Sequence, residues 1–174
     1  LGERPEEGPA AKGFDRSFVN LYGAGNHYSE TGFDPAHPIT IYKENGDTTA
    51  WPSGAYSTDL FTDKLIGYID ESLTADKPFF SFAAYTSPHW PLQVDPVHWK
   101  KFEGRYDDGY EALRNRRFQN VKDLGLIPAD AELPDPHPRV TPWDTLSPEE
   151  QRFESRKMEL YAGMIDNLDM NIGR

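Results

Sequence analysis

The chain of 174 residues has 37% hydrophobic and 27% charged residues, a balance typical of one globular domain and not of a disordered segment. Its net charge of -11 argues against a nucleic-acid partner, and the absence of cysteine excludes disulfides, thiolate metal sites and a cysteine nucleophile. No apolar run approaches the roughly 20 residues that a membrane helix needs, and no signal-peptide pattern opens the chain.

The first 50 residues predict loops and one small hairpin. Residues 1–13 are rich in charge, proline and glycine, which predicts an irregular connection, and residues 13–22 have mixed strand and turn character. Residues 39–42 alternate apolar side chains and precede an Asn45-Gly46 turn signal. We therefore predict a small surface hairpin that lies outside the main sheet.

The next segment predicts a helix followed by a buried strand. The helix covers residues 58–73, with Ser57 or Thr58 as its cap. Its apolar face recurs every three or four residues and comprises Phe61, Leu65, Ile66, Ile69 and Leu73. The run from Phe79 to Tyr85 is apolar and aromatic apart from one serine, which is typical of a strand covered on both faces in a mostly parallel sheet. Helix and strand together predict an α/β layered fold.

Three helices are predicted in the second half of the chain. A short helix over residues 95–102 begins with Asp95 as its cap, and a second over residues 108–124 ends at Gly125. After a proline-rich excursion over residues 126–146, Ser147 and Glu150 form a capping box for the last helix. The side chains expected to face inward are Leu113, Phe118, Val121 and Leu124 on the second helix, and Tyr161, Met164, Ile165, Leu168 and Ile172 on the last.

His89 is the leading candidate for a catalytic residue. It follows the predicted strand and stands between Pro88 and Pro91, which each fix a backbone dihedral and stiffen the loop. Ligands of parallel sheets bind beyond the carboxyl ends of the strands, and histidine is the side chain that exchanges protons near neutral pH. The alternative interpretation is a structural histidine hydrogen-bonded under a loop.

The other polar candidates have weaker signals. His27 lies in a glycine-bounded loop and could line a pocket, although most loop histidines are only solvated. No pair of histidines has the close spacing of a zinc site. Two acidic pairs, Asp107 with Asp108 and Asp166 with Asp169, invite a calcium interpretation. Because they stand at a helix start and on a helix, without the loop of an EF-hand, we interpret both pairs as structural.

Several strings, in this order along the chain, resemble the sulfatase family, and bacterial arylsulfatases of the alkaline-phosphatase-like superfamily most of all. They are GFDRSF at 13–18, GNHY at 25–28, YSTD at 56–59 with DKL at 63–65, PFF at 78–80, SPHWPLQ at 87–93, YAGMID at 161–166 and NIGR at 171–174. The resemblance covers nearly the whole chain and is weakest around 33–50 and 128–146. It implies a partial alkaline-phosphatase-like layered fold with a mostly parallel sheet and flanking helices.

The resemblance also implies an arylsulfatase-like sulfuric ester hydrolase that cleaves sulfate monoesters. In this family a cysteine or serine within C/S-x-P-x-R becomes formylglycine, whose hydrated aldehyde attacks sulfur, and calcium neutralises the sulfate oxygens. His89 matches the family histidine that contacts the sulfate ester, and it is a candidate to protonate the leaving oxygen. The chain has no C/S-x-P-x-R string, and the resemblance places the calcium ligands outside it.

We therefore expect residues 1–174 to form one partial domain, the central part of a sulfatase catalytic domain without its N-terminal nucleophile region and C-terminal metal-ligand region. Such a piece is expected to be inactive alone, with His89 as its catalytic residue and without cofactor-binding or metal-binding residues. The expected partners are a small sulfate ester and the remaining parts of the same domain.

Two alternatives stay open from the sequence: a phosphonate or phosphate monoester hydrolase of the same superfamily, and a non-catalytic sulfatase-like binding module. The sequence also leaves open the organic group of the substrate, the oligomeric state, and whether the nucleophile derives from cysteine or serine or is absent. The compartment is undetermined between the bacterial cytoplasm and periplasm.

Overall fold

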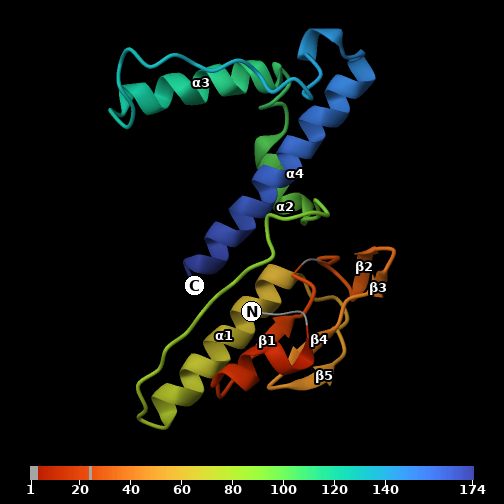
Figure 1. Cartoon of the computed structure of the whole chain (residues 1–174), viewed down its shortest axis with the longest axis vertical. Helices are drawn as coiled ribbons and strands as arrows, with labels where there is room; N and C mark the ends of the chain where they lie inside the picture. The colour runs from red at the N-terminus through yellow and green to blue at the C-terminus, as the bar shows by residue number, and fades with distance from the viewer. Residues whose placement is uncertain (1–3, 24) are drawn as a thin grey trace.

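The computed structural model describes residues 4–23 and 25–174 and shows an α/β part and a helical part that meet near the C-terminal end of the last helix (Figure 1). The elements in chain order are the 3-10 helices η1 (Pro5–Glu7) and η2 (Pro9–Lys12), the strands β1 (Phe18–Asn20), β2 (Thr31–Asp34), β3 (His37–Ile39), β4 (Tyr42–Glu44) and β5 (Asp47–Thr49), then α1 (Ser57–Thr74), α2 (Pro96–Trp99), η3 (Lys100–Phe102), α3 (Gly109–Asp123), η4 (Trp143–Thr145) and α4 (Pro148–Ile172).

The strands form two small antiparallel sheets, one in the order β1-β4-β5 and one of β2 with β3. The α/β class is confirmed, but the predicted mostly parallel sheet is wrong for the described residues, where each strand pair is antiparallel. Parallel pairs need a crossover of a dozen or more residues, and the connections within the β2-β3 and β4-β5 hairpins are much shorter.

The predicted hairpin is confirmed, but it starts later in the chain than predicted and belongs to a three-stranded sheet. Its strands are β4 and β5, and its turn residues Asn45 and Gly46 have φ of 52° and 96°, the left-handed region that such a turn requires. The hairpin does not stand apart from the main sheet, because β4 also pairs with β1, with Phe18 opposite Glu44.

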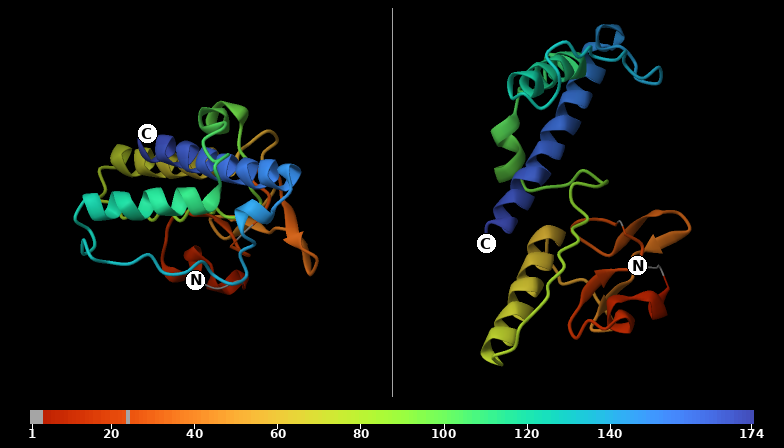
Figure 2. Two further views of the ribbon diagram at one scale, coloured as in Figure 1. Left: turned by 90° about the horizontal axis from the view of Figure 1, so that it is seen from above. Right: turned by 60° about the vertical axis from the view of Figure 1, so that its left-hand side comes forward.

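The predicted buried strand at residues 79–85 is wrong. The segment is extended but has no ladder, because no described segment lies beside it to accept and donate its backbone hydrogen bonds. Its aromatic side chains are largely exposed, including Phe80 at 79%. The segment runs alongside α1 in both views (Figures 1 and 2), and the Tyr85 hydroxyl lies 2.9 Å from the Thr62 hydroxyl of that helix.

Helix α1 confirms the helix predicted over 58–73, but its beginning and its buried face differ. Tyr56 is the N-cap residue and makes no capping bond through its side chain, so the predicted Ser57 or Thr58 cap is wrong. The fully buried residues of the helix are polar, namely Ser57, Thr58 and Thr62, whereas the apolar Leu73 is 62% exposed.

Helices α2 and α3 begin and end close to their predicted bounds. The Asp95 carboxylate accepts a hydrogen bond from the Val97 N–H at 2.9 Å, which is the predicted cap of α2. Gly125 follows α3 with φ of 68° and ends it as predicted. Leu124, predicted to face inward, is 72% exposed.

Helix α4 has the predicted capping box but buries a different face. Ser147 and Glu150 exchange the two hydrogen bonds of the box. Of the predicted inward stripe, Met164 is fully buried, whereas Ile165 and Ile172 are 42% and 68% exposed. The buried stripe instead recurs every fourth residue and is polar or small: Ser155, Glu159, Gly163, Asn167 and Asn171.

The two parts of the molecule are joined where the end of α4 meets the start of α1. One oxygen of the Asp59 carboxylate accepts hydrogen bonds from the Asn167 and Asn171 amides, at 3.0 and 2.7 Å. The apolar core next to this junction consists of Tyr56, Val94 and Met164, packed against Leu92, Trp99 and Leu160. This core therefore draws on the N-cap residue of α1, on α2 and α4, and on the segment that follows His89.

Candidate active site

His89 lies in the loop of residues 86–93, between the extended segment and α2. Its N–H donates to the Thr86 carbonyl at 2.8 Å, and its Nδ1 donates to the Trp90 carbonyl at 2.9 Å, since a carbonyl can only accept. The peptide bonds before Pro88 and Pro91 are both cis. The side chain is exposed, so the loop presents the imidazole at the surface of the described residues.

The loop rests on a second histidine that the sequence did not single out as functional. His27 is 1% exposed and lies directly beneath His89, with its Nε2 3.1 Å from the His89 carbonyl oxygen. Its Nδ1 lies 2.6 Å from the Ser57 hydroxyl at the start of α1. The expectation of a solvated loop histidine is therefore wrong for His27.

The far end of the loop is held at the same place. The His27 N–H donates to the Gln93 side-chain oxygen at 3.0 Å, and the His27 carbonyl accepts from the Ser57 N–H at 2.8 Å. The Tyr56 hydroxyl donates to the Gln93 carbonyl at 2.9 Å. Burial raises the pKa of Tyr56, so this hydroxyl remains a donor throughout the physiological range.

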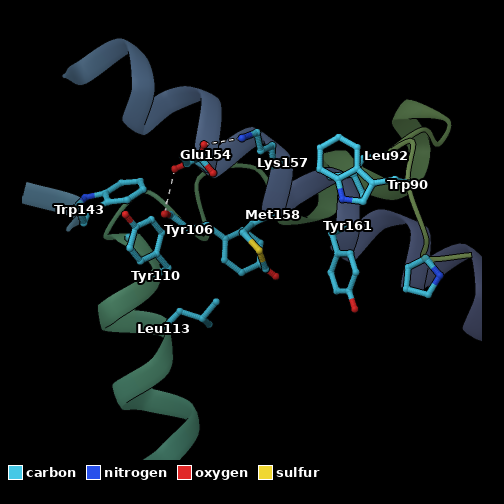
Figure 3. Close-up of a pocket in the computed structure, with 13 residues that line it drawn as sticks. Trp90, Leu92, Tyr106, Tyr110, Leu113, Trp143, Glu154, Lys157, Met158 and Tyr161 are labelled. Atoms are coloured by element: carbon cyan, nitrogen blue, oxygen red, sulfur yellow. Dashed lines mark hydrogen bonds and ion pairs between the residues drawn. The ribbon is translucent and has the colours of Figure 1, made fainter. Parts of the chain in front are cut away.

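A cavity of about 270 Å³ adjoins the other side of the loop (Figure 3). Pro88, Trp90 and Leu92 contribute to its wall, whereas His89 does not line it. The remaining wall combines aromatic, aliphatic and polar side chains from α3, the turn before it, η4 and α4, and within it the rings of Tyr110 and Trp143 meet edge to face with their centroids 5.4 Å apart. The cavity is therefore an apolar space behind the loop and separate from the imidazole.

One member of each acidic pair considered for calcium is engaged with basic side chains. Asp108, just before α3, forms an ion pair with Arg116, which lies eight residues further along the chain on that helix. Asp166 on α4 accepts from His98 at 2.7 Å and from Lys101 at 2.6 Å. Within residues 4–23 and 25–174, no three histidine, aspartate or glutamate side chains are grouped so as to hold a metal ion. The residues present therefore do not fit a calcium site.

Replacing Asp166 by asparagine is expected to lower the urea midpoint of the intact protein at pH 7. Burial opposes ionisation of Asp166, but its hydrogen bonds from Lys101 and His98 prevail and lower its pKa. A lowered carboxyl pKa stabilises the fold above the unfolded value of about 3.9, and this contribution is lost as the pH falls through the folded value. The difference in midpoint between wild type and variant should therefore shrink as the pH is lowered below about 4. A difference that does not change with pH would contradict this assignment.

A family model described as Sulfatase matches residues 6–174 of the chain. The chain belongs to the sulfatase family. The fold of this family is alkaline-phosphatase-like, so the two antiparallel sheets and the helices described above are part of that fold.

Curated relatives agree with the family. The chain is 39% identical over 183 residues to an uncharacterized sulfatase of Schizosaccharomyces pombe, covering 100% of this chain and 33% of that protein. It is 32% identical over 182 residues to an arylsulfatase of Klebsiella aerogenes, covering 99% of this chain and 37% of that protein. Arylsulfatase J of Mus musculus is 30% identical over 109 residues, covering 62% of this chain and 17% of that protein. The chain thus spans about a third of the length of the first two relatives.

The described part of this sulfatase chain has no helix that is both long and apolar enough to cross a membrane. The sequence placed His89 in its loop and offered His27 as a possible pocket residue, but it did not predict that His27 and His98 are buried. The signal that could have singled out His27 is its place in the GNHY string of the resemblance, residues 25–28. His98 gave no comparable signal, since its partners Asp166 and Asn167 lie 68 and 69 residues further along the chain.

Proposed function

We propose that this chain is the central part of the catalytic domain of an arylsulfatase-like sulfuric ester hydrolase that cleaves sulfate monoesters. The family match and the arylsulfatases among its relatives support this reaction class. The observation that carries the proposal is the presentation of His89, an exposed imidazole on a loop whose backbone is held from beneath by a buried histidine. A proton donor must come within hydrogen-bond reach of the ester oxygen, and an accessible imidazole on a fixed backbone can meet that requirement.

His89 acts in this proposal as the residue that contacts the ester and protonates the leaving oxygen. Because Nδ1 donates to the Trp90 carbonyl, Nε2 is the ring atom that gains and loses the proton. When the bond between sulfur and the ester oxygen breaks, that oxygen develops negative charge, and proton transfer from His89 Nε2 releases it as a neutral alcohol or phenol.

Formylglycine and calcium belong to the same proposal and are assigned to the remaining parts of the domain. Calcium, when bound, neutralises charge on the sulfate oxygens as a Lewis acid. No step is derived through it, because the described residues do not supply a group of ligands for it. By the same assignment, residues 1–174 are expected to be inactive alone.

The extended segment of residues 78–86 supports the view that further parts of the domain pack against this chain. Its backbone has no ladder partner among the described residues, and Phe79, Phe80 and Phe82 are 49%, 79% and 60% exposed. An unpaired strand edge that carries exposed aromatic side chains is normally paired or covered in a stable protein.

Rates on matched esters test the proposed reaction. The intact protein is expected to hydrolyse an aryl sulfate faster than the phosphonate and phosphate esters of the same phenol, compared as kcat/KM. A preference for the phosphonate or phosphate would overturn the sulfatase proposal in favour of the related hydrolases. An intact protein that lacks a modifiable cysteine or serine and binds the aryl sulfate without turnover would instead be a binding module.

A further inference from the structure

The buried His27 has hydrogen-bond partners that fix its tautomer. The His89 carbonyl, 3.1 Å from Nε2, has only lone pairs, so Nε2 must carry the hydrogen and donate it. Nδ1 then accepts from the Ser57 hydroxyl at 2.6 Å. Burial lowers the pKa of His27, although its backbone hydrogen bond to His89 has the opposite effect. The lowered pKa favours the neutral ring.

The bond from His27 controls the geometry on which the His89 side chain depends. The His89 carbonyl belongs to the peptide plane between residues 89 and 90, so holding it restricts the backbone dihedrals on both sides of that plane. The next carbonyl along, that of Trp90, is the one that accepts from His89 Nδ1. The orientation of the His89 imidazole is therefore set one peptide away from the atom that His27 holds.

His27 also contacts the loop at two places, its middle and its far end. Its ring holds residue 89 while its N–H holds the side chain of Gln93, and its carbonyl is bound to the first turn of α1. By contrast, the bond from the Ser87 hydroxyl to the Met164 carbonyl, which ties the start of the loop to α4, is long at 3.5 Å. The short bonds that tie residue 89 and residue 93 to the body of the protein thus meet at His27 and Tyr56.

We propose that His27 is a positioning residue for the reaction: its neutral imidazole clamps the His89 backbone to the start of α1 and thereby orients the His89 ring toward the ester. The expected effect on turnover rests on the proposed sulfatase function. The clamp itself rests on the geometry alone.

Two variants of His27 in the intact protein test the clamp. In His27→Gln the side-chain amide nitrogen reaches the place of Nε2 and still donates to the His89 carbonyl, whereas the shorter side chain of His27→Asn does not. We expect His27→Asn to lower kcat on an aryl sulfate by about 10-fold or more, with a smaller change in KM, because a displaced proton donor costs transition-state stabilisation. His27→Gln should recover most of that loss.

A matched control and a second readout keep the outcomes separate. His37→Asn changes an exposed histidine of β3 and should leave kcat unchanged.

Hydrogen exchange of the peptide covering residues 86–93 should become faster in His27→Asn and stay near the wild-type rate in His27→Gln. It should become partly faster in Ser57→Ala, which removes the donor to Nδ1. These exchange rates report on the clamp even if the wild type has no sulfatase turnover, a result that would sink the proposed function alone.

The clamp itself would be overturned by two results. One is unchanged exchange of residues 86–93 in His27→Asn. The other is an equal loss of kcat in His27→Asn and His27→Gln together with faster exchange throughout α1 and α4, since such a pattern shows a general loss of folding and no specific role in orienting His89.

Discussion

Replacing His89 by alanine in the intact protein is expected to lower turnover of an aryl sulfate by roughly 10²-fold or more, the usual contribution of a positioned general acid. The loss should grow with the basicity of the leaving phenol, because a poor leaving group depends most on receiving a proton as the bond breaks. The measurement is kcat on a series of ring-substituted phenyl sulfates for wild type and variant. The chain offers a matched control in His137→Ala, an exposed histidine of the proline-rich excursion.

An unchanged rate in His89→Ala would remove His89 from the mechanism. A uniform loss across all leaving groups would also contradict its role as an acid, and it would indicate instead that His89 stabilises charge on the sulfate group itself. If the rate is unchanged, the Trp90 carbonyl that holds Nδ1 retains only a structural significance.

Replacing Gly163 by alanine is expected to destabilise the intact protein by about 1 to 3 kcal/mol in the free energy of unfolding, the usual cost of overpacking a close contact. Gly163 lies on α4 where α2 crosses it, and a Cβ there would come within 2.7 Å of both the Cα and the Cβ of Trp99. Real Cβ atoms do not approach that closely, so one helix must shift. Because the Trp99 contact includes backbone atoms, no side-chain rotation relieves it.

Gly67→Ala is the matched control for Gly163→Ala. Gly67 is also a mid-helix glycine, on α1, but it is exposed and a Cβ there meets nothing within 4 Å. Alanine should stabilise that helix by up to about 1 kcal/mol, because it restricts the unfolded chain and favours helical dihedrals. Urea unfolding of both variants gives the comparison. If Gly163→Ala were as stable as Gly67→Ala, the close crossing of α2 and α4 would be wrong.

Local signals account for the parts of the fold that the sequence predicted well. The capping box of Ser147 and Glu150, the cap of Asp95 and the stop at Gly125 all involve partners within four residues. The turn at Asn45 and Gly46 likewise requires only the left-handed dihedrals of two adjacent residues. These features needed no knowledge of distant segments, so the helix bounds and the hairpin were predictable.

Long-range partners account for the errors. The segment from Phe79 to Tyr85 has the composition of a central strand, but a strand exists only beside another, and none of the described segments pairs with it. The buried stripe of α4 was not predicted because its polar members are stabilised by hydrogen bonds to groups that are distant in the sequence. Glu159 accepts from the Gly104 N–H, Ser155 donates to the Tyr106 carbonyl, and Asn171 donates to Asp59. Hydrophobic periodicity cannot reveal a buried face whose side chains are polar.

The candidate site likewise has features that the sequence predicts and features that depend on long-range packing. The sequence by itself determined the α/β class, the resemblance to the sulfatases, and His89 as the residue between two prolines, because each depends on residue types and their order. Only the tertiary structure decided that His27 lies beneath His89, since the hydrogen bond between them joins residues 62 positions apart. Such a contact depends on how two loops and the start of α1 pack together, and a single sequence records no trace of that packing.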